Sequence, residues 1–460
     1  MADQPNILII LSDQLRRNAL GLYGNSDIAT PNCDFLGSKG VVFKNACSSY
    51  PVCVPFRFTL MTGHYAHSRA VPAIEYRMSP SERTLADEFN DAGYETVYIG
   101  KWHLYGSLAR KPLNSLEIIS RTPVPALYRG RWQKWYGFDF CNNHSETLYF
   151  VDDEVTPRRL DTYQTDGLFD VAIEHLTERT DSEQPFIMVI SVEAPHPPYQ
   201  APDELTRKWM ARNIQLPPNF DTPDETTRFH RIKQRKIYNA MVENLDYNIG
   251  RMNLFLEERG LAENTVKIVL ADHGEMGGSH GKIAKQHPFE ESVGIPLIIS
   301  DPRYSGARSN WIDDPVCTED LFPTLLGLAG LSPKNAVPGQ NLAPLIWGKQ
   351  DRLGREGVLL EFVAEHRPQM PYHNQTWRGY RTRRYKYTVL GGASGGHPWQ
   401  FFDLQQDPFE MVNLINAPLV ASEVAQHHGL LRAALVDSQD HYLLAPAFGF
   451  ESLNIPDMLS

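Results

Sequence analysis

The sequence predicts an α/β protein: a large, mainly parallel sheet sandwiched by helices, followed by a smaller C-terminal α+β subdomain built on an antiparallel sheet. Continuous apolar runs such as Ile7–Leu11 are typical of strands buried on both faces of a parallel sheet. Helical patterns alternate with strand patterns along the first 350 residues, as expected when helices cover both faces of such a sheet. Beyond that point short strand patterns follow one another without helices, which favours antiparallel pairing.

The larger domain is predicted to contain two well-marked helices and one long irregular region. Residues 81–95 have the pattern of a capped amphipathic helix that closes at Gly93. A helix at 229–259 has apolar residues four positions apart and ends at Gly260. Residues 104–160 are rich in Arg, Pro, Gly and Trp without a clear period, so we expect long loops there. The other predicted elements are a helix at 164–179 and strands at 7–11, 96–100, 185–192, 266–271 and 295–299.

The pattern change near residue 350 predicts three parts: 1–350 as the larger α/β domain, 351–440 as the antiparallel-sheet subdomain, and 441–460 as a tail. The tail contains the aromatic residues Tyr442, Phe448 and Phe450, which either pack on their own chain or reach a neighbouring subunit of a homo-oligomer. The predicted elements of the subdomain are strands at 358–363, 376–381, 385–390 and 400–404 and a helix at 421–436.

Composition and charge limit the class of protein. The 460 residues are 42% apolar and 22% charged, as in ordinary globular proteins. The net charge of −11 argues against a nucleic-acid or polyanion binder, which would normally have a basic face. We therefore expect no nucleic-acid partner, and an anionic ligand would have to be attracted by a local pocket.

The apolar segments and the cysteines predict the compartment. The apolar run Ile7–Leu11 is too short for a signal sequence, and no later segment reaches membrane-spanning length, so no membrane partner is expected. The cysteines are odd in number and scattered without zinc-ligand spacing, which suits a reducing compartment. We predict a cytoplasmic protein. The cysteines are Cys33, Cys47, Cys53, Cys141 and Cys317.

The stretch Cys53–Gly63, C-V-P-F-R-F-T-L-M-T-G, points most directly to chemistry. Pro55 suits the first turn of a helix, where its missing N–H needs no partner. Cys53 would then lie at the helix N-terminus, where unpaired N–H groups and the dipole favour an anion. Arg57, one turn further, adds a permanent cation suited to an oxyanion. A small buried cysteine before a proline-started helix is the ordinary alternative, so the prediction depends on other parts of the chain.

Two strand ends carry side chains that suit a metal ion. Asp13 and Gln14 follow the first apolar run, and Asp272 and His273 follow the strand at 266–271. Ligands of open α/β sheets bind beyond the carboxyl ends of the strands. Carboxylate and amide oxygens suit hard cations such as Ca²⁺, Mg²⁺ or Mn²⁺. Each pair alone also fits an ordinary turn or helix cap, so the prediction depends on their joint presence.

These motifs resemble the sulfatase family of the alkaline phosphatase superfamily. The family signature C-x-P-S-R-x-x-x-x-T-G is matched from Cys53, with Phe56 in place of the serine. Gly100–His103 matches the family's G-K-W-H, and Lys285–Ser292 resembles K-x-x-x-Y-E-E-S with phenylalanine in place of the tyrosine. His196 matches the family's histidine before a proline.

The resemblance continues into the C-terminal region. Arg381–Tyr387 and Phe402–Glu410 are similar to R-T-x-x-Y-K-Y and Y-D-L-x-x-D-P-x-E, whose role in the family is mostly structural. The motifs extend over nearly the whole chain and occur in the family's order. The resemblance therefore covers both predicted parts.

By this resemblance the protein is expected to be a sulfuric ester hydrolase, arylsulfatase-like, with residues 1–350 as the catalytic domain. A formylglycine-generating enzyme would oxidise Cys53 to formylglycine, the nucleophile, beside one divalent ion, with Ca²⁺ favoured over Mn²⁺ or Mg²⁺. The substrate would be a small-molecule sulfate ester. The catalytic residues so implied are Cys53, Arg57, Lys101, His103, His196 and Lys285, and the metal ligands are Asp13, Gln14, Cys53, Asp272 and His273.

The resemblance also implies a separate role in the reaction for each of these groups. The metal, Arg57 and the lysines would neutralise the sulfate oxygens and hold the ester in line. His196 with Lys285 would protonate the departing alcohol. His103 would deprotonate the second hydroxyl of the hydrated aldehyde, which expels sulfate; an unmodified thiol lacks that route.

Two other functions remain open at this point. The metal set Asp–Gln–Asp–His also occurs in phosphonate monoester and phosphodiester hydrolases of the same superfamily, although Lys101 and His103 favour sulfate. A non-catalytic binder of sulfated ligands with unmodified Cys53 is the second alternative, and Phe56 is its only support. Contacts to the alcohol half of a substrate are expected from 104–160, the loop after His280, and the stretch around 372–374, without a readable code.

Overall fold

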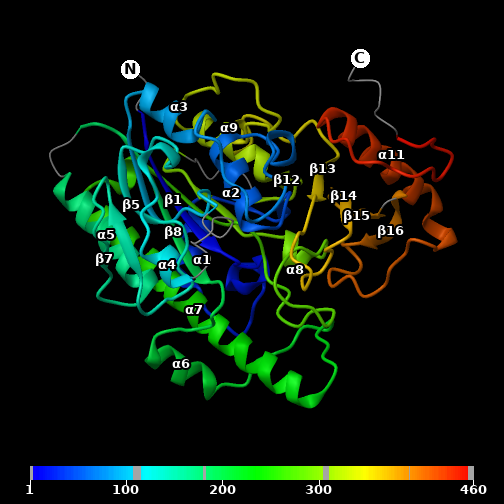
Figure 1. Ribbon diagram of the computed structural model, residues 1–460, viewed down its shortest axis with the longest axis horizontal. Helices are drawn as coiled ribbons and strands as arrows, with labels where there is room; N and C mark the ends of the chain where they lie inside the picture. Colours follow the sequence, from blue (N-terminus) through cyan, green and yellow to red (C-terminus); the bar gives the residue numbers. More distant parts are fainter. Residues whose placement is uncertain (1–3, 107–115, 180–182, 304–309, 393, 454–460) are drawn as a thin grey trace.

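The computed structural model has two parts that lie side by side in Figure 1, a large α/β part and a small antiparallel sheet with its helix at the right. Together they confirm the predicted fold class. The division of the chain at residue 350 stays a prediction. The structure describes residues 4–106, 116–179, 183–303, 310–392 and 394–453.

The large sheet is built around β1, whose eight residues are all buried. It pairs in parallel with β8 on one side and with β9 on the other. Apolar side chains on both faces of these central strands explain the continuous hydrophobic runs of the sequence. In spatial order the strands are β11 (Trp311–Ile312), β2 (Val41–Phe43), β10 (Leu297–Ser300), β9 (Thr265–Ala271), β1 (Asn6–Asp13), β8 (Phe186–Pro195), β4 (Glu95–Lys101), β5 (Lys134–Phe138), β6 (Leu148–Val151) and β7 (Arg158–Arg159).

The prediction of long loops throughout 104–160 was wrong in part. β5 pairs in parallel with β4, and β6 pairs antiparallel with β5, so the region extends the sheet. Trp135 of β5 stacks on Tyr98 of β4 at 5.4 Å between ring centroids, which fixes the strand despite its glycine. Residues 107–115 of that prediction lie outside the described residues.

Helix α2 (Cys53–Thr62) is the central helix, and every one of its ten residues is buried. It ends at Gly63, whose φ of +74° is the left-handed conformation that glycine adopts readily. Helix α7 (Glu225–Glu258) begins four residues before the prediction because Asp224 caps it by accepting a hydrogen bond from Thr227 N.

The remaining helices and short strands cover the sheet and connect its strands. Helix α3 begins with a capping box between Thr84 and Asp87, as the sequence pattern predicted. The bounds are α1 (Pro31–Ser38), α3 (Leu85–Asp91), α4 (Leu116–Ser120), α5 (Gln164–Glu178), α6 (Asp203–Met210), α8 (Glu290–Val293), α9 (Leu321–Leu328), α10 (Ala343–Ile346), β3 (Ala46–Cys47) and β12 (Val316–Cys317).

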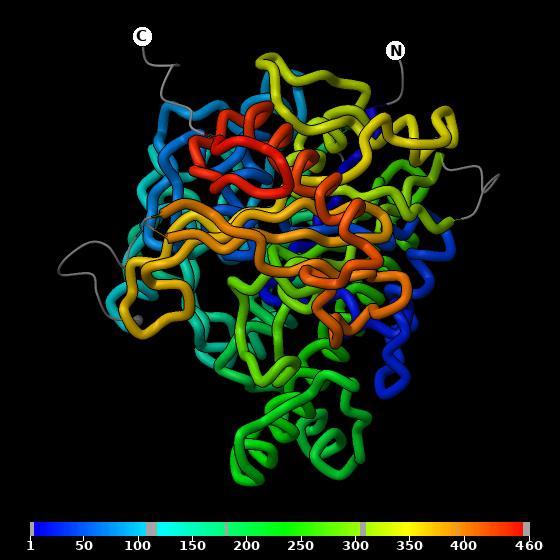
Figure 2. The backbone as a smooth tube through the Cα atoms, turned by 90° about the vertical axis from the view of Figure 1, so that its right-hand side faces the viewer, coloured from blue at the N-terminus to red at the C-terminus, as the bar shows by residue number. Residues whose placement is uncertain are grey.

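The C-terminal part is a four-stranded antiparallel meander covered by one helix. Its core includes Tyr387, Phe401 and Leu431. The tail packs on its own chain as far as Leu453. Within it, Leu444 pairs with Gly396 of the small sheet, and Figure 2 shows the tail above that sheet. The elements are β13 (Gly357–Phe362), β14 (Thr376–Thr382), β15 (Tyr385–Gly392), β16 (Gly395–Asp403) and α11 (Ala421–Asp437).

A buried histidine joins the two parts. His67, in the turn after α2, has Nδ1 2.6 Å from Glu361 Oε2 of β13 and Nε2 3.2 Å from the carbonyl oxygen of Ser438. Burial alone would lower the pKa of His67, but the negative charge of Glu361 raises it to about 9. The imidazole is therefore protonated at neutral pH and donates from both nitrogens.

Within the described part of the chain, none of the helices combines the length and the apolar character needed to cross a membrane.

Candidate active site

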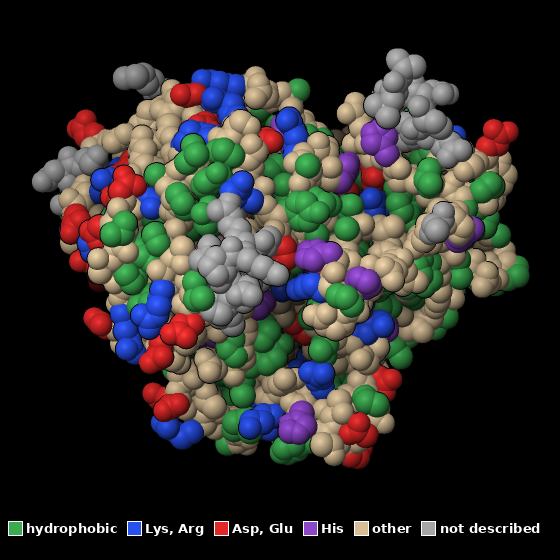
Figure 3. All heavy atoms as spheres, viewed as in Figure 1, with side chains coloured by type: hydrophobic (Ala, Val, Ile, Leu, Met, Phe, Trp, Pro, Cys, Tyr) green, Lys and Arg blue, Asp and Glu red, His purple; other side chains and the backbone are tan. Residues whose placement is uncertain are grey.

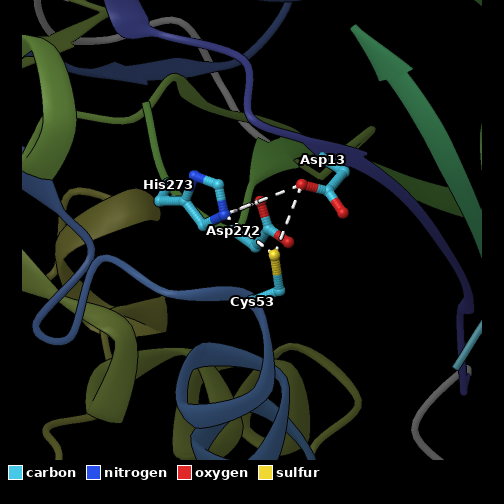
Figure 4. A group of neighbouring side chains, drawn as sticks. All are labelled: Asp13, Cys53, Asp272 and His273. Carbon is cyan, nitrogen blue, oxygen red and sulfur yellow. Dashed lines mark hydrogen bonds and ion pairs between the residues drawn. The ribbon is translucent and has the colours of Figure 1, made fainter. Parts of the chain in front are cut away.

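Four side chains from three elements converge at one edge of the large sheet (Figure 4). Asp13 ends β1, Cys53 begins α2, and Asp272 and His273 follow β9. The adjacent strands β1 and β9 run parallel in register, with Ser12 opposite Ala271, so their carboxyl ends deliver the two aspartates together. One ligand atom from each of the four side chains lies within 4.8 Å of the others.

The spacing within this cluster suits a cation. His273 Nε2 lies 3.6 Å from Asp13 Oδ1 and 3.5 Å from Asp272 Oδ1. Such separations are long for hydrogen bonds but fit neighbouring ligands of one cation, each about 2.4 Å from it. His273 Nδ1 donates to the carbonyl oxygen of Gly274 at 3.0 Å, which turns Nε2 toward the cluster. Asp272 Oδ2 is buried without a hydrogen-bond partner among the described residues.

Cys53 lies inside the cluster. Its Sγ is 3.1 Å from His273 Nε2 and 3.6 Å from Asp13 Oδ1, and its side chain is fully buried. The structure therefore brings together the cysteine and the two predicted metal segments.

Gln14 is held by a residue that sequence reasoning missed. Its backbone has a φ of +66°, and its N–H donates to Asp272 Oδ1 at 3.0 Å. The side-chain NH₂ donates to Glu275, which leaves the carbonyl oxygen to accept from Lys285 Nζ at 2.9 Å. Glu275 is itself fixed by the backbone N–H groups of Gly277 and Ala284. Its place directly after Asp-His-Gly was the signal available in the sequence.

The two buried cations are paired with the aspartates. Lys101 Nζ is 2.6 Å from Asp13 Oδ2, and Arg57 Nη2 is 3.2 Å from Asp272 Oδ2 and 3.6 Å from Asp13 Oδ2. Burial opposes ionisation of Asp13, but the positive charges around it, led by Lys101, hold its pKa well below the usual value. Lys101 and Arg57 thus help to keep Asp13 ionised.

Lys285 and His196 form the open side of the site. Both are partly exposed, whereas the other predicted site residues are buried. Lys285 Nζ lies 3.4 Å from Cys53 Sγ. Figure 3 shows histidine, lysine and arginine side chains gathered near the middle of this face, between the α/β part and the C-terminal sheet.

His196 and His103 are neutral bases in the free site. Burial and the neighbouring charge of Lys285 hold the pKa of His196 well below its usual value. Burial and the charge of Lys101 do the same to the pKa of His103. The imidazole of His196 donates from Nδ1 to the carbonyl oxygen of Pro197 at 2.6 Å, which leaves Nε2 available to exchange a proton. His103 Nδ1 is buried without a hydrogen-bond partner among the described residues.

Two further residues near the site were not predicted. Glu193, a fully buried carboxylate in the apolar strand β8, is 3.8 Å from Lys101 Nζ and accepts hydrogen bonds from Cys141 N and Asn142 N. An acidic residue within an apolar strand was the signal for it. Arg367, from the C-terminal part, donates hydrogen bonds to Glu365, which also accepts from Gln286, the residue after Lys285.

Comparison with known proteins gives consistent results. Residues 5–331 match the family model described as Sulfatase, and residues 278–437 match that of the C-terminal region of N-sulphoglucosamine sulphohydrolase. An ulvan-active sulfatase of Formosa agariphila is 29% identical over 420 residues, which cover 90% of this chain and 78% of that protein.

Solved structures are similar over nearly the full length. YidJ of Bacteroides fragilis is 26% identical with a TM-score of 0.84, covering 96% of this chain and 97% of that one. The phosphonate monoester hydrolase of Agrobacterium radiobacter shares the fold at 22% identity with a TM-score of 0.73, covering 94% of this chain and 96% of that one.

Proposed function

Since the chain belongs to the sulfatase family and is a sulfuric ester hydrolase, we propose that it cleaves a small-molecule sulfate monoester with a formylglycine made from Cys53 and one divalent ion. The observation that carries the proposal is the position of Cys53 Sγ, between Asp13 and His273 at the first residue of α2. A cysteine with only a packing role has no need of two metal-type side chains within 4 Å of its sulfur.

The ion would be held by the oxygens of Asp13, Asp272 and Gln14 and by His273 Nε2, together with the oxygen made from Cys53. The separations between these donors support this set, as does Asp272 Oδ2, which has an ion pair with Arg57 but no hydrogen bond among the described residues. Such an ion acts as a Lewis acid that offsets negative charge on oxygen. Ca²⁺ is the ion we expect, because oxygen donors predominate.

The residue at position 53 would be the nucleophile after oxidation by a formylglycine-generating enzyme. A hydrated aldehyde there supplies an attacking oxygen and a second hydroxyl that allows sulfate to leave later, whereas a sulfated thiol would be trapped. The helix N-terminus beneath it favours the anionic groups that gather at this point.

His196 and Lys285 would serve the departing alcohol. They are the partly exposed members of the site, so the alcohol half of a substrate must leave past them. The sulfate brings a negative charge that offsets Lys285 and raises the proton affinity of His196 Nε2. His103, neutral and with an unpartnered Nδ1, is suited to accept the proton of the second hydroxyl.

The proposal is tested by intact mass and turnover of the same preparation. Protein made together with the formylglycine-generating enzyme should show the mass of the aldehyde at residue 53 and release sulfate from 4-nitrophenyl sulfate. Cys53→Ala should show neither. A preparation that contains the aldehyde and Ca²⁺ but cleaves no sulfate ester in a broad panel would refute the proposal.

A further inference from the structure

We propose that a hollow beside Lys285 binds the alcohol half of the substrate and selects a sugar ring that carries a second negative charge. This inference rests on the function proposed above and names the substrate class for it. The hollow has a volume of about 580 Å³, within the range of small-molecule sites. It lies between the loop after the predicted metal segment and the small C-terminal sheet, and Lys282, His287, Tyr372 and Trp399 are among the residues that line it.

The hollow adjoins the reacting centre through Lys285. Ile283 and His287, which both line the hollow, are each two residues from Lys285 along the chain. Since successive Cα atoms are 3.8 Å apart, both walls lie within about 8 Å of the Lys285 backbone. Lys285 Nζ in turn contacts Cys53 Sγ at 3.4 Å. The proposal therefore places the alcohol half of an ester in this hollow when its sulfate lies at Cys53.

One wall of the hollow is aromatic. The rings of Tyr372 and Trp399 meet edge to face at 6.3 Å between centroids. Tyr372 is anchored by a hydrogen bond between its hydroxyl and His287 Nδ1 at 2.9 Å. Fixed aromatic and aliphatic surfaces of this kind accept a flat ring at little entropic cost. The wall thus suits the carbon face of a sugar.

The residues that line the hollow also include two cations and no acid. Arg231 and Lys282 line the hollow, and neither forms an ion pair with a carboxylate among the described residues. Arg231 has one hydrogen bond, to Gln234 Oε1 at 2.7 Å. In a chain with a net charge of −11, two cations without acidic partners make this a local site for an anion. A carboxylate or a second sulfate on the ring would receive charge-assisted hydrogen bonds there.

The test compares glucose and glucuronic acid esters sulfated at the same position, O-2, O-3 or O-4. We expect at least one glucuronic acid ester to have a kcat/KM about tenfold or more above its glucose counterpart. Lys282→Gln and Arg231→Gln should each reduce that ratio to threefold or less while leaving kcat/KM for 4-nitrophenyl sulfate within about twofold. Lys233→Gln, an exposed cation on the same helix as Arg231 that does not line the hollow, is the matched control.

Two results would overturn the inference: ratios near one at all three positions, or a preference that both charge-removing variants retain. A binding measurement distinguishes a failure of the proposed selectivity from a failure of the proposed hydrolysis. Calorimetry with Cys53→Ala and the same esters should show the glucuronic acid preference without turnover, and Lys282→Gln in that background should abolish it. If the oxidised protein hydrolyses no ester but Cys53→Ala still binds the glucuronic acid esters more tightly, the proposed hydrolase function is refuted. The proposed selectivity of the hollow is then retained. Equal binding of both sugars would refute the selectivity.

Discussion

The ammonium group of Lys285 lies 3.4 Å from Cys53 Sγ, at the open side of a site whose other cations, Arg57 and Lys101, are buried against aspartates. The same ammonium donates to Gln14 Oε1 at 2.9 Å. The three cations are therefore not equivalent. Arg57 and Lys101 are paired with the aspartates, and Lys285 lies on the partly exposed side of the site.

Replacing Lys285 should impair poor leaving groups more than good ones. For Lys285→Ala we expect kcat/KM to fall roughly 100-fold or more with an alkyl sulfate, and about tenfold with 4-nitrophenyl sulfate, whose alcohol needs little protonation. Steady-state kinetics with a series of leaving groups measures the difference. Lys233→Ala is the control, and equal losses across the series would contradict a role at the leaving oxygen.

The pH dependence of kcat should respond to the pair Lys285 and His196. The positive charge of Lys285 lowers the pKa of His196, so its removal raises that pKa. If protonated His196 is the acid, kcat falls as pH rises through its pKa in the substrate complex, and Lys285→Gln moves this alkaline limb to higher pH. His196→Ala should abolish the limb. If the alkaline limb moved to lower pH in Lys285→Gln, the prediction that Lys285 lowers the pKa of His196 would be wrong.

Divalent ions should stabilise the folded chain through Asp272. Without an ion, Asp13 and Asp272 are buried close together, and Arg57 and Lys101 form ion pairs with them. We expect Ca²⁺ to raise Tm of the parent protein and a chelator to lower both Tm and activity. Asp272→Asn should lose most of the response to Ca²⁺ and at least about 100-fold in kcat/KM. An unchanged Ca²⁺ effect on Tm in this variant would place the ion elsewhere.

The free energy of unfolding should decline between pH 6.5 and 9 because of His67. Its pKa in the folded protein is raised to about 9 from an ordinary 6.5, so the stabilisation is complete below pH 6.5 and is lost as pH rises through 9. The contribution is on the order of 3 kcal/mol, since each pKa unit corresponds to ~1.4 kcal/mol. Denaturant titrations of the parent and His67→Gln at several pH values measure it. If the free energy of unfolding of the parent and of His67→Gln changed with pH in parallel between pH 6.5 and 9, His67 would be excluded as the cause.

Sulfate esters should be preferred over phosphonate monoesters. The fold shared with a phosphonate monoester hydrolase leaves both reactions possible, but Lys101 and His103 are present in this site. We expect kcat/KM for 4-nitrophenyl sulfate to exceed that for the matched phenylphosphonate ester by tenfold or more. Competition between the two esters in one reaction gives the ratio directly, and a large phosphonate preference would reverse the assignment.

The central strands and most of the candidate site could be predicted from the sequence because they depend on local patterns. The strand ends at Asp13 and Asp272 and the proline-started helix at Cys53 are local patterns, and parallel pairing of β1 with β9 brings them together. β5 escaped prediction because five residues that include a glycine have little strand pattern, and its stability comes from Trp135 packing on Tyr98.

The supporting contacts of the site could not be read in the same way. The hydrogen bond from Gln14 to Glu275 and the ion pair between Lys101 and Glu193 join residues far apart in the chain. Neither has a periodic or motif signature, because each contact exists only after the strands have paired. The cytoplasmic location and the homo-oligomer likewise stay predictions.

The burial of α2 sets an order of events in the life of the chain. Cys53 and the nine residues after it are all inaccessible once the sheet has closed over them. If Cys53 is oxidised as proposed above, a maturation enzyme would have to reach it before that closure. Folding speed would then compete with oxidation, and a chain that folded first would keep its thiol.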